Sequence, residues 1–399
     1  MEFTIEKEFF LGAIQRLCGL SKNESPNYEH VGEISIKAEK DRLLLGASNG
    51  FISAVQELKD DSLLSIIKEG ETVIIGSKLQ SIIKSVNEKQ RVKIKTTSEN
   101  LVREIIGQKR KLTVPIYPKK ASVSLETIEG KEFSVPADIF NGSIREIIPC
   151  VGEGEYNPVY KNVFIEFRKG ETRFVCGDGS LFAIICNQDN SNKHIKTDNE
   201  RNGYIIPSLQ AILLPALFEE ATVIRGTFSK KTYYFETDTG LKVLVNGIPL
   251  EHVSYIPYEK QSDRIAERIV SVEADFKSLS QVVADMDAIR DREYEKRYDC
   301  IPVHFTVKDD ELTFKSDFTN KLECSIPAHN FKSYDGETVE CQDDYALTIF
   351  SEIVKFGSSD SYELSFLGKD DVVFCSFPND PEERKRIVFF TTVADPNEE

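Results

Sequence analysis

The stretch EFTIEKEFFLGAIQRL at residues 2–17 returns as EFSVPADIFNGSIREI at residues 132–147. At this offset of 130 residues five positions are identical, namely Glu2, Phe3, Phe10, Gly12 and Ile14 of the first copy, and three apolar pairs agree in kind, Ile5 with Val135, Phe9 with Ile139 and Leu17 with Ile147. The stretch SKLQSII at 77–83 meets PSLQAIL at 207–213 at the same offset. Self-similarity at a fixed spacing marks a repeat architecture, so the sequence predicts a chain of repeated units.

Weaker landmarks extend the repeat over the whole chain. SNG at 48–50 meets GDG at 177–179, and KLTV at 111–114 meets KVLV at 242–245. A third copy is predicted from VSVEADFKSLSQVV at 270–283, ELTFKSDFTNKLECSI at 311–326 and YALTIFSEIV at 345–354. We therefore predict three domains, at 1–120, 121–258 and 259–399, joined by the polar stretches at 117–132 and 257–268.

Each unit has the pattern of two amphipathic helices and several strands. Phe3 and Ile5 alternate as in a half-buried strand, and residues 10–17 place apolar side chains at i, i+3, i+4 and i+7. The stretch 79–86 repeats the helical spacing. This predicts an α+β fold, with helices packed on mostly antiparallel sheet and with Leu79 and Leu209 buried against their sheets.

The bulk composition indicates a soluble, globular, multidomain protein. The chain has 399 residues, of which 40% are hydrophobic and 29% charged. No apolar run approaches 18 residues, and Glu2 and Glu6 precede any apolar run, so neither a membrane span nor a signal peptide is expected. Eight scattered cysteines without a C-x-x-C pair indicate reduced thiols in a cytoplasmic protein. The net charge of −16 argues against a nucleic-acid-binding protein, because such proteins are usually basic. A local basic surface can nevertheless exist within an acidic protein.

No catalytic or metal-binding motif is present in the sequence. Phosphate-loop, nucleophile-elbow and H-E-x-x-H motifs are missing, and GEGEYN at 152–157 lacks the third glycine of a dinucleotide loop. The five histidines have no metal-ligand spacing. The expectation is a protein that is not an enzyme and that has no cofactor and no metal.

Several predicted helices carry a basic residue away from their apolar stripe. On a helical wheel Arg16 lies about 120° from Phe10, and Arg145 about 140° from Phe140. A solvated helix face is the simple explanation for any one of these bases. Their recurrence in related units makes them candidate DNA-binding residues, namely Arg16, Lys22, Lys78, Lys84, Arg145, Lys277 and Lys355. The predicted helix at 208–219 has no Lys or Arg, so any positive lining is expected to be uneven.

These features resemble the bacterial-type DNA polymerase sliding clamp, the β subunit family, in divergent form. The resemblance runs the whole length apart from the acidic tail after about Val393. MEFTIEKEFFLGAIQRL is similar to the clamp N-terminus, FVCGDGSLFAI at 174–184 to the family's Thr-Asp-Gly-His-Arg-Leu-Ala segment, and VLVNGIPLEHVSYIP at 243–257 to the end of its second domain. The low identity leaves both a host and a phage origin open.

The resemblance implies a head-to-tail homodimer, a six-domain ring around duplex DNA. Such a ring is a processivity factor: bases on the inner helices contact phosphates without selecting sequence, while an acidic outside repels DNA. The implied partners are double-stranded DNA, a replicative DNA polymerase, a clamp-loader complex and a second copy of the chain, without a membrane. The implied localisation is the bacterial cytoplasm or nucleoid, or a phage-infected cell.

The resemblance also implies a hydrophobic pocket for partners between the second and third domains. Its wall would comprise Tyr160, Asp178, Gly179, Leu181, Phe182, Leu250, Tyr255, Ile256, Tyr345, Ile387, Val388 and Phe389. The sequence departs from the family here, because Ser180-Leu181 replaces His-Arg and the C-terminal Met-Pro-Met-Arg-Leu becomes Phe-Phe-Thr-Thr-Val at 389–393. A reshaped apolar pocket with a different partner motif is therefore expected.

Three other hypotheses remain. A non-catalytic recruitment scaffold without DNA encirclement is favoured by the acidic charge and by the base-free helix at 208–219. An enzyme with a site between domains would need ionisable groups that converge in space, and no motif in the sequence indicates such a group. A two-repeat, trimeric clamp of the eukaryotic type is disfavoured by the count of three units.

Overall fold

The structure is a computed structural model of the whole chain. It describes residues 1–22, 32–87, 90–116, 123–125, 127–152, 161–177, 181–192, 203–229, 231–248, 258–290, 301–308, 310–316, 321–336, 340–357, 361–368 and 372–390. The chain divides into two compact units, Met1–Gly142 with Leu209–Pro249, and Ser143–Ser208 with Leu250–Glu399. The three domain ranges expected from the sequence stay a prediction.

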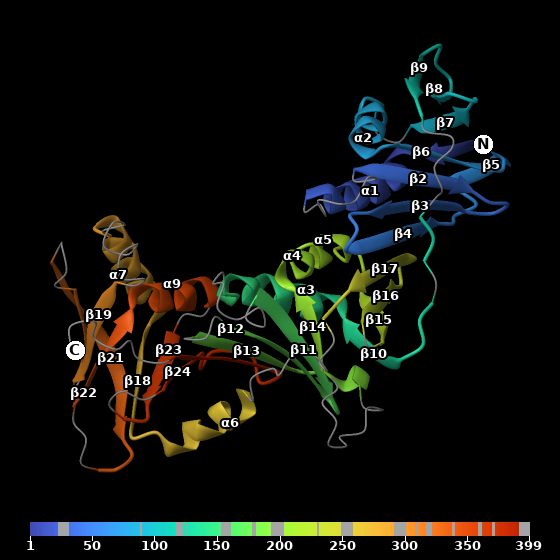
Figure 1. Ribbon diagram of the computed structural model, residues 1–399. Helices are drawn as coiled ribbons and strands as arrows, with labels where there is room; N and C mark the ends of the chain where they lie inside the picture. Colours follow the sequence, from blue (N-terminus) through green and yellow to red (C-terminus); the bar gives the residue numbers. More distant parts are fainter. Residues whose placement is uncertain are drawn as a thin grey trace. The chain divides into compact units, whose positions relative to one another are not determined.

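The order of helices and strands repeats three times along the chain (Figure 1). The first repeat contains β1 (Glu2–Glu6), α1 (Lys7–Cys18), η1 (Gly19–Lys22), β2 (Glu33–Ala38), β3 (Leu43–Ser48), β4 (Ile52–Leu58), β5 (Leu64–Lys68), β6 (Gly70–Ile75), α2 (Gly76–Lys84), β7 (Arg91–Thr96), β8 (Asn100–Ile105) and β9 (Lys111–Pro115). The second contains β10 (Lys131–Pro136), α3 (Ala137–Ile147), η2 (Ile148–Cys150), β11 (Asn162–Arg168), β12 (Glu171–Gly177), β13 (Leu181–Gln188), η4 (Asn190–Asn192), β14 (Gly203–Pro207), α4 (Ser208–Ala211), α5 (Leu214–Leu217), β15 (Val223–Phe228), β16 (Thr232–Thr237) and β17 (Leu241–Asn246). The third follows α6 (Tyr258–Asp263) and η6 (Arg264–Glu267), and contains β18 (Val270–Asp275), α7 (Phe276–Ala288), β19 (Pro302–Lys308), β20 (Glu311–Ser316), β21 (Leu322–Ser333), β22 (Glu340–Ala346), α9 (Leu347–Phe356), β23 (Ser361–Phe366), β24 (Val373–Ser376) and β25 (Arg384–Phe390).

Strand pairing repeats with the same order in each third of the chain. One set of four is β4-β3-β2-β6, then β13-β12-β11-β14, then β21-β20-β19-β22. The other set is β1-β7-β8-β9, then β10-β15-β16-β17, then β18-β23-β24-β25. The strand pairs in the described part are antiparallel, so the predicted α+β fold with antiparallel sheets is confirmed.

Two joints connect neighbouring repeats through continuous sheet. In the first compact unit β17 pairs with β4 over Leu241–Val245 and Ile52–Gln56. In the second compact unit β25 pairs with β13 over Arg384–Phe390 and Leu181–Asn187. In each joint the last strand of one repeat adds to the edge of the preceding repeat, so one joint geometry is used twice.

The first helix of each repeat begins directly after a strand. The Glu6 carboxylate accepts a hydrogen bond from the backbone N–H of Phe9 at 2.9 Å, and Asp275 accepts one from Ser278 at 2.7 Å. A side-chain acceptor at this position satisfies an amide that has no partner inside the helix, and such a cap typically contributes about 1 kcal/mol. The second repeat has Pro136 at the equivalent place.

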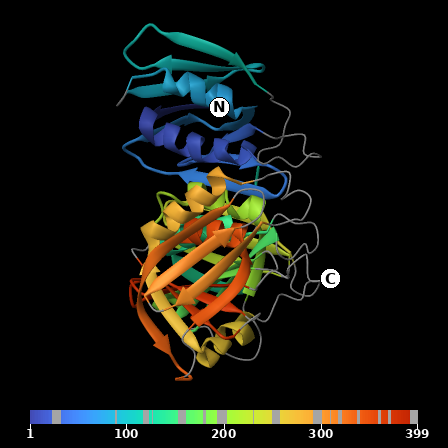
Figure 2. The ribbon, with the colours of Figure 1, turned by 90° about the vertical axis from the view of Figure 1, so that its left-hand side faces the viewer.

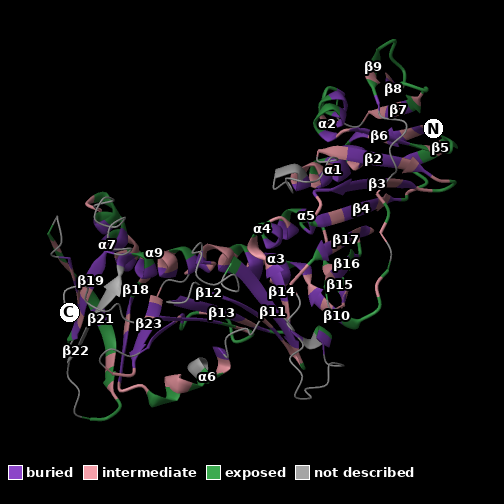
Figure 3. Cartoon of the chain, in the orientation of Figure 1, coloured by how far each residue is buried: buried purple, intermediate pink, exposed green. Residues whose placement is uncertain are grey.

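Aromatic side chains fill the core beneath these helices. Phe3 and Phe10 are fully buried and meet edge to face with ring centroids 5.8 Å apart. In the second repeat Phe140 packs on Phe218 and Phe235, with centroid separations of 5.7 and 5.9 Å. Figure 2 shows α1 and α2 lying side by side on their sheet, and Figure 3 shows their inner sides buried.

The second helix of the second repeat differs from its prediction. It is broken into α4 and α5, because Pro215 has no N–H to donate and its ring crowds the carbonyl one turn earlier. Leu79 is fully buried, but Leu209 is 64% exposed, so the expectation that Leu209 packs on its sheet is wrong.

A register shift explains the exposure of Leu209. Strand pairing matches Ile75 to Glu33 and Pro207 to Asn162, so Gly76 and Ser208 are the equivalent first residues of the two helices. The structural offset is thus 132 residues here, whereas the letters align at 130. A shift of two residues rotates a helical side chain by about 200°, and Ala211 takes the buried place of Leu79.

Candidate functional site

Four of the predicted DNA-binding bases lie on exposed helix faces. Lys78 and Lys84 on α2, Arg145 on α3 and Lys277 on α7 are exposed. Within the described part of the chain none of these four side chains forms an ion pair. Their charges are therefore available to an anionic partner such as a phosphate.

Arg16 does not lie on an exposed face. Its side chain is 12% exposed and forms an ion pair with Glu220, which follows α5. Its second guanidinium nitrogen donates to Gln56 Oε1 at 3.3 Å. The predicted outward orientation of Arg16 is wrong, because a helical wheel shows which side of a helix is polar but not which neighbouring element covers that side.

Two further predicted DNA-binding residues, Lys355 and Lys22, differ from the four exposed and unpaired bases. Lys355 on α9 is exposed, but its ammonium group lies 2.8 Å from the Glu352 carboxylate one turn earlier. Lys22 ends η1, and only its backbone is described. The DNA-binding role of each predicted base stays a prediction.

Acidic residues share several of these helix faces. Asp138 is exposed on α3, and Asp285 and Asp287 are exposed on α7. Glu219 and Glu220 are exposed after α5. Among the helices of the three repeats, α2 is the one whose described residues include exposed bases and no acid. The positive charge of the helix faces is thus concentrated on α2.

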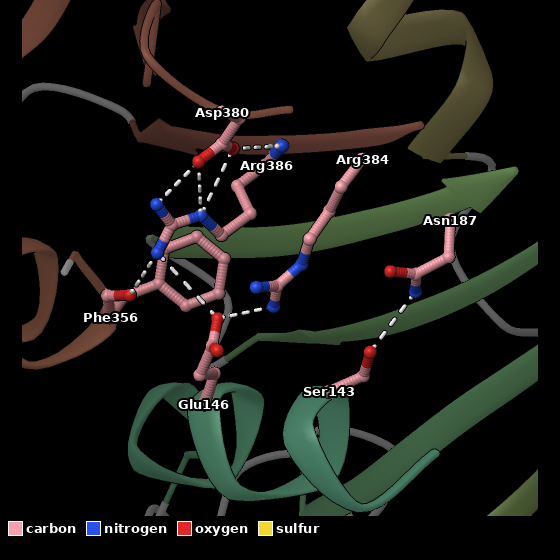
Figure 4. A network of polar contacts seen from close by, with 7 residues as sticks. All are labelled: Ser143, Glu146, Asn187, Phe356, Asp380, Arg384 and Arg386. Atoms are coloured by element: carbon pink, nitrogen blue, oxygen red, sulfur yellow. Dashed lines mark hydrogen bonds and ion pairs between the residues drawn. The ribbon is translucent and has the colours of Figure 1, made fainter. Parts of the chain in front are cut away.

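A buried polar network holds the second joint together (Figure 4). Arg386 on β25 is 3% exposed and binds Asp380 through its guanidinium at 2.5 Å and through its backbone N–H at 3.1 Å. It also donates to the Phe356 carbonyl at 3.3 Å, where α9 ends, and its guanidinium carbon lies 4.6 Å from the centroid of the Phe377 ring. Glu146 on α3 lies 2.5 Å from Arg384 and 3.6 Å from Arg386.

The tenth residue of a repeat's first helix forms an ion pair in both joints. Arg16 is the tenth residue of α1, and Glu146 is the tenth residue of α3. Each pairs with an opposite charge from the following repeat, Glu220 for Arg16 and Arg384 for Glu146. Both joints thus contain an ion pair at the same helix position, with the positive charge on the helix in the first joint and the negative charge on the helix in the second.

Five of the predicted pocket residues lie in the paired strands β13 and β25. Phe182 pairs with Phe389, and their rings stack with centroids 5.2 Å apart. Phe389 also lies 5.8 Å from Phe374, measured between ring centroids. Successive side chains of a strand point to opposite faces, so Ile387 and Phe389 share the face of Phe182, while Leu181 and Val388 face the other way.

The two faces have different neighbours. Phe390, which pairs with Leu181, contacts Phe350 of α9 with centroids 6.3 Å apart, so Leu181 and Val388 face the helix layer. Of the five predicted pocket residues in these strands, Phe182, Ile387 and Phe389 share one face and remain candidates for a common wall of the pocket. The remaining predicted wall positions lie outside the described residues, namely Tyr160, Asp178, Gly179, Leu250, Tyr255 and Ile256, and of Tyr345 only the backbone is described.

A buried tyrosine anchors α6 on the sheet of the second compact unit. The Tyr258 hydroxyl donates to Glu166 Oε2 at 2.5 Å, and Arg168 donates to the same carboxylate at 2.8 Å. Burial, with the Glu166 carboxylate beside it, raises the pKa of Tyr258 well above its ordinary value. No sequence motif indicated that Tyr258 anchors α6, although Tyr258 directly follows the predicted pocket segment.

The described residues contain no group of three or more His, Cys, Asp or Glu side chains placed to hold a metal ion. None of the helices in the described ranges has the length and apolar character that crossing a bilayer requires.

Comparison with known proteins identifies the fold. Residues 1–134 match the family model of the DNA polymerase III beta subunit, N-terminal domain. The DNA polymerase III subunit beta from Pseudomonas aeruginosa is 13% identical, with a TM-score of 0.81 over 99% of this chain and 100% of that chain. The beta subunit from DNA polymerase of Streptococcus pyogenes is 15% identical, with a TM-score of 0.80 over 99% and 100%. The DNA polymerase sliding clamp from Bacillus subtilis is 14% identical, with a TM-score of 0.80 over 99% of each chain.

No curated protein sequence matches the chain. The full-length structural matches give this chain the sliding-clamp fold, and the fold predicted from the resemblance is confirmed.

Proposed function

We propose that this chain, with its sliding-clamp fold, is a processivity factor that closes as a homodimeric ring around duplex DNA and acts without catalysis. The observation that carries the proposal is the joint geometry. Each internal joint adds the last strand of one repeat to the edge of the preceding one. Three repeats offer three such positions, and a single chain uses two. The third position is then available to another copy.

Within the described part of the chain, the two edges of the unused joint have no strand paired to them. β9 is an edge strand with exposed side chains at four of its five positions. β21 pairs with β20 over Leu322–Pro327 and with β18 beyond Pro327, so its first half has one open edge in the described part. Pairing β9 of one copy with β21 of another is a head-to-tail contact, and repeating it closes a two-chain ring.

Charge favours the same contact. Residues 1–120 contain 20 Lys and Arg against 16 Asp and Glu, whereas residues 259–399 contain 17 against 32. The first repeat is thus basic and the third strongly acidic. The exposed turn between β8 and β9 carries Lys109 and Arg110 (Figure 3), and Asp285 is the tenth residue of α7. Asp285 therefore has the position that pairs with the following repeat in both internal joints, and the following repeat belongs to the second copy.

Closure of the ring supplies the proposed mechanism. A closed ring is held on DNA by topology, so its contacts with phosphates need not be tight. Exposed lysines and arginines on the helix faces neutralise phosphates without contacting base edges, which leaves the ring free to move along any sequence. The proposed partners besides DNA are a replicative polymerase and a clamp loader, in the compartment where the DNA is replicated.

Retention on closed circular DNA tests this proposal. The protein is diluted with relaxed circular plasmid so that the rings open, concentrated again, and washed at high salt, which weakens ordinary phosphate contacts. We expect the protein to stay with circular plasmid and to leave after the plasmid is cut once. The same plasmid linearised beforehand is the matched control. Equal loss from both forms would contradict encirclement, and a stable dimer with that result would favour the recruitment scaffold.

We further propose that the face formed by Phe182, Ile387 and Phe389 receives an apolar segment of the polymerase. These side chains belong to adjacent strands of the second joint, and Phe182 and Phe389 stack. An aromatic face of this kind fits a short apolar motif, because buried aromatic anchors carry much of the energy of such contacts.

Phe182→Leu is expected to weaken polymerase binding by about two- to tenfold, since an aromatic pair contributes about 0.5–1.5 kcal/mol. The measurement is the clamp concentration that gives half-maximal product length on primed circular DNA. Phe174→Leu is the matched control, because Phe174 is a fully buried phenylalanine of the neighbouring strand β12. Equal effects of the two substitutions would mean that Phe182 contributes core packing alone.

A further inference from the structure

Helix α2 differs from the other described helices of the repeats in the composition of its exposed face. Ser77, Lys78, Ser81, Lys84 and Ser85 are exposed, whereas Leu79, Ile82 and Ile83 are buried. On a helical wheel the two lysines flank the three serines, with a rise of about 9 Å between the lysines. The face thus presents two cations with small uncharged hydroxyl groups between them.

Further positive charge surrounds the C-terminal end of α2. Arg103 on β8 is buried, and its guanidinium donates to Ser85 Oγ at 3.2 Å. Burial lowers the pKa of Arg103 from its ordinary value, and the neighbouring Arg110 acts in the same direction. Within the described ranges neither arginine forms an ion pair. Among the described residues, therefore, no carboxylate forms an ion pair with this group of charges.

The other helix faces have compensating or unsuitable groups. Arg16 is paired with Glu220, and Lys355 with Glu352. Lys277 shares α7 with exposed Asp285 and Asp287. Leu209 on α4 and Ile212, which directly follows α4, are 64% and 52% exposed and bear no charge.

We infer that α2 is the principal phosphate-contacting helix of the ring, so that the duplex is held mainly against the first repeat of each copy. This inference rests on the proposed function. The ligand is the backbone of duplex DNA, because a face whose described residues are cations and hydroxyls without an acid is complementary to phosphates, which carry no sequence information. With two copies, the ring has two such helices and weaker contacts elsewhere.

The salt dependence of binding to a short linear duplex tests the assignment. Each phosphate neutralised adds about 0.9 to the slope of log K against log salt concentration. Lys78→Gln with Lys84→Gln is expected to lower this slope by about two for each α2 in contact. Arg145→Gln with Lys277→Gln also removes two exposed cations, and we expect it to lower the slope by less than half as much, because these bases make the weaker contacts. Glutamine preserves helix propensity in both variants.

The outcomes separate this inference from the proposed function. Equal reductions of slope in the two variants, or a larger one in the Arg145/Lys277 variant, would overturn the assignment to α2 while circular-DNA retention still supports the ring. Loss of retention on circular DNA by the unaltered protein would overturn encirclement itself. Light scattering checks each variant, and dissociation of the Lys78/Lys84 variant into single chains would assign these lysines to ring closure instead.

Discussion

Thr113→Pro is expected to separate the proposed ring into single chains of 45.2 kDa. Ile105 N donates to the Arg110 carbonyl, and Ile116 N donates to the Glu99 carbonyl. Bonded pairs alternate in an antiparallel ladder, so Leu112 and Val114 also bond to β8, whereas Thr113 turns its N–H toward the open edge. Proline at this position removes a hydrogen bond to the second copy and none to β8. Proline is tolerated at such an edge position.

The expected effect is large because a two-chain ring contains the joint twice. A lost backbone hydrogen bond at each joint costs about 1–2 kcal/mol, which together raises the dimer dissociation constant about 30- to 1,000-fold. Thr113→Val keeps the N–H and the strand propensity, so we expect this control to remain dimeric. Light scattering across a dilution series measures both variants. If Thr113→Pro stays dimeric down to the concentration at which the unaltered protein does, β9 is not the joint strand.

The repeat and the fold class could be predicted from the sequence because they depend on patterns that survive divergence. Phe3, Phe10 and their counterparts at 133 and 140 remain apolar since each fills the same buried place. The second helix was predicted at the right location but in the wrong register. LQ at 79–80 and at 209–210 is a similarity of letters, whereas strand pairing and Pro215 set the helix start and its end.

The candidate site was harder to predict because it depends on neighbours distant in sequence. The helical wheel placed Arg16 on a polar side, but Glu220 covers that side from 204 positions away. The consecutive residues Ile387, Val388 and Phe389 were predicted as one wall, yet strand alternation sends Val388 toward α9. Asp380 and Arg386 are a few residues apart, and nothing in their spacing indicates that both are buried.

Arg386→Met is expected to destabilise the fold by about 3–5 kcal/mol, measured as the free energy of unfolding in urea. The Asp380 carboxylate would remain buried while losing its guanidinium partner, and the Phe356 carbonyl would lose a donor. Methionine approximates the length of the removed side chain, so the loss reflects uncompensated charge more than lost volume. Arg42→Met is the matched control: Arg42 pairs with Glu39 at 2.7 Å but its side chain is 41% exposed, and exposed pairs contribute about 0–1 kcal/mol.

Asp380→Asn introduced into Arg386→Met identifies the cause of the loss. Asparagine removes the buried negative charge and keeps an oxygen that can accept from the Arg386 backbone N–H. If the unpaired charge dominates, the double variant is more stable than Arg386→Met alone, because the second substitution relieves the penalty that the first creates. Additive losses would instead mean that the arginine acts through packing on Phe377 and through its bond to Phe356. The network would then hold the joint by shape, and a neutral side chain of suitable form could replace Arg386.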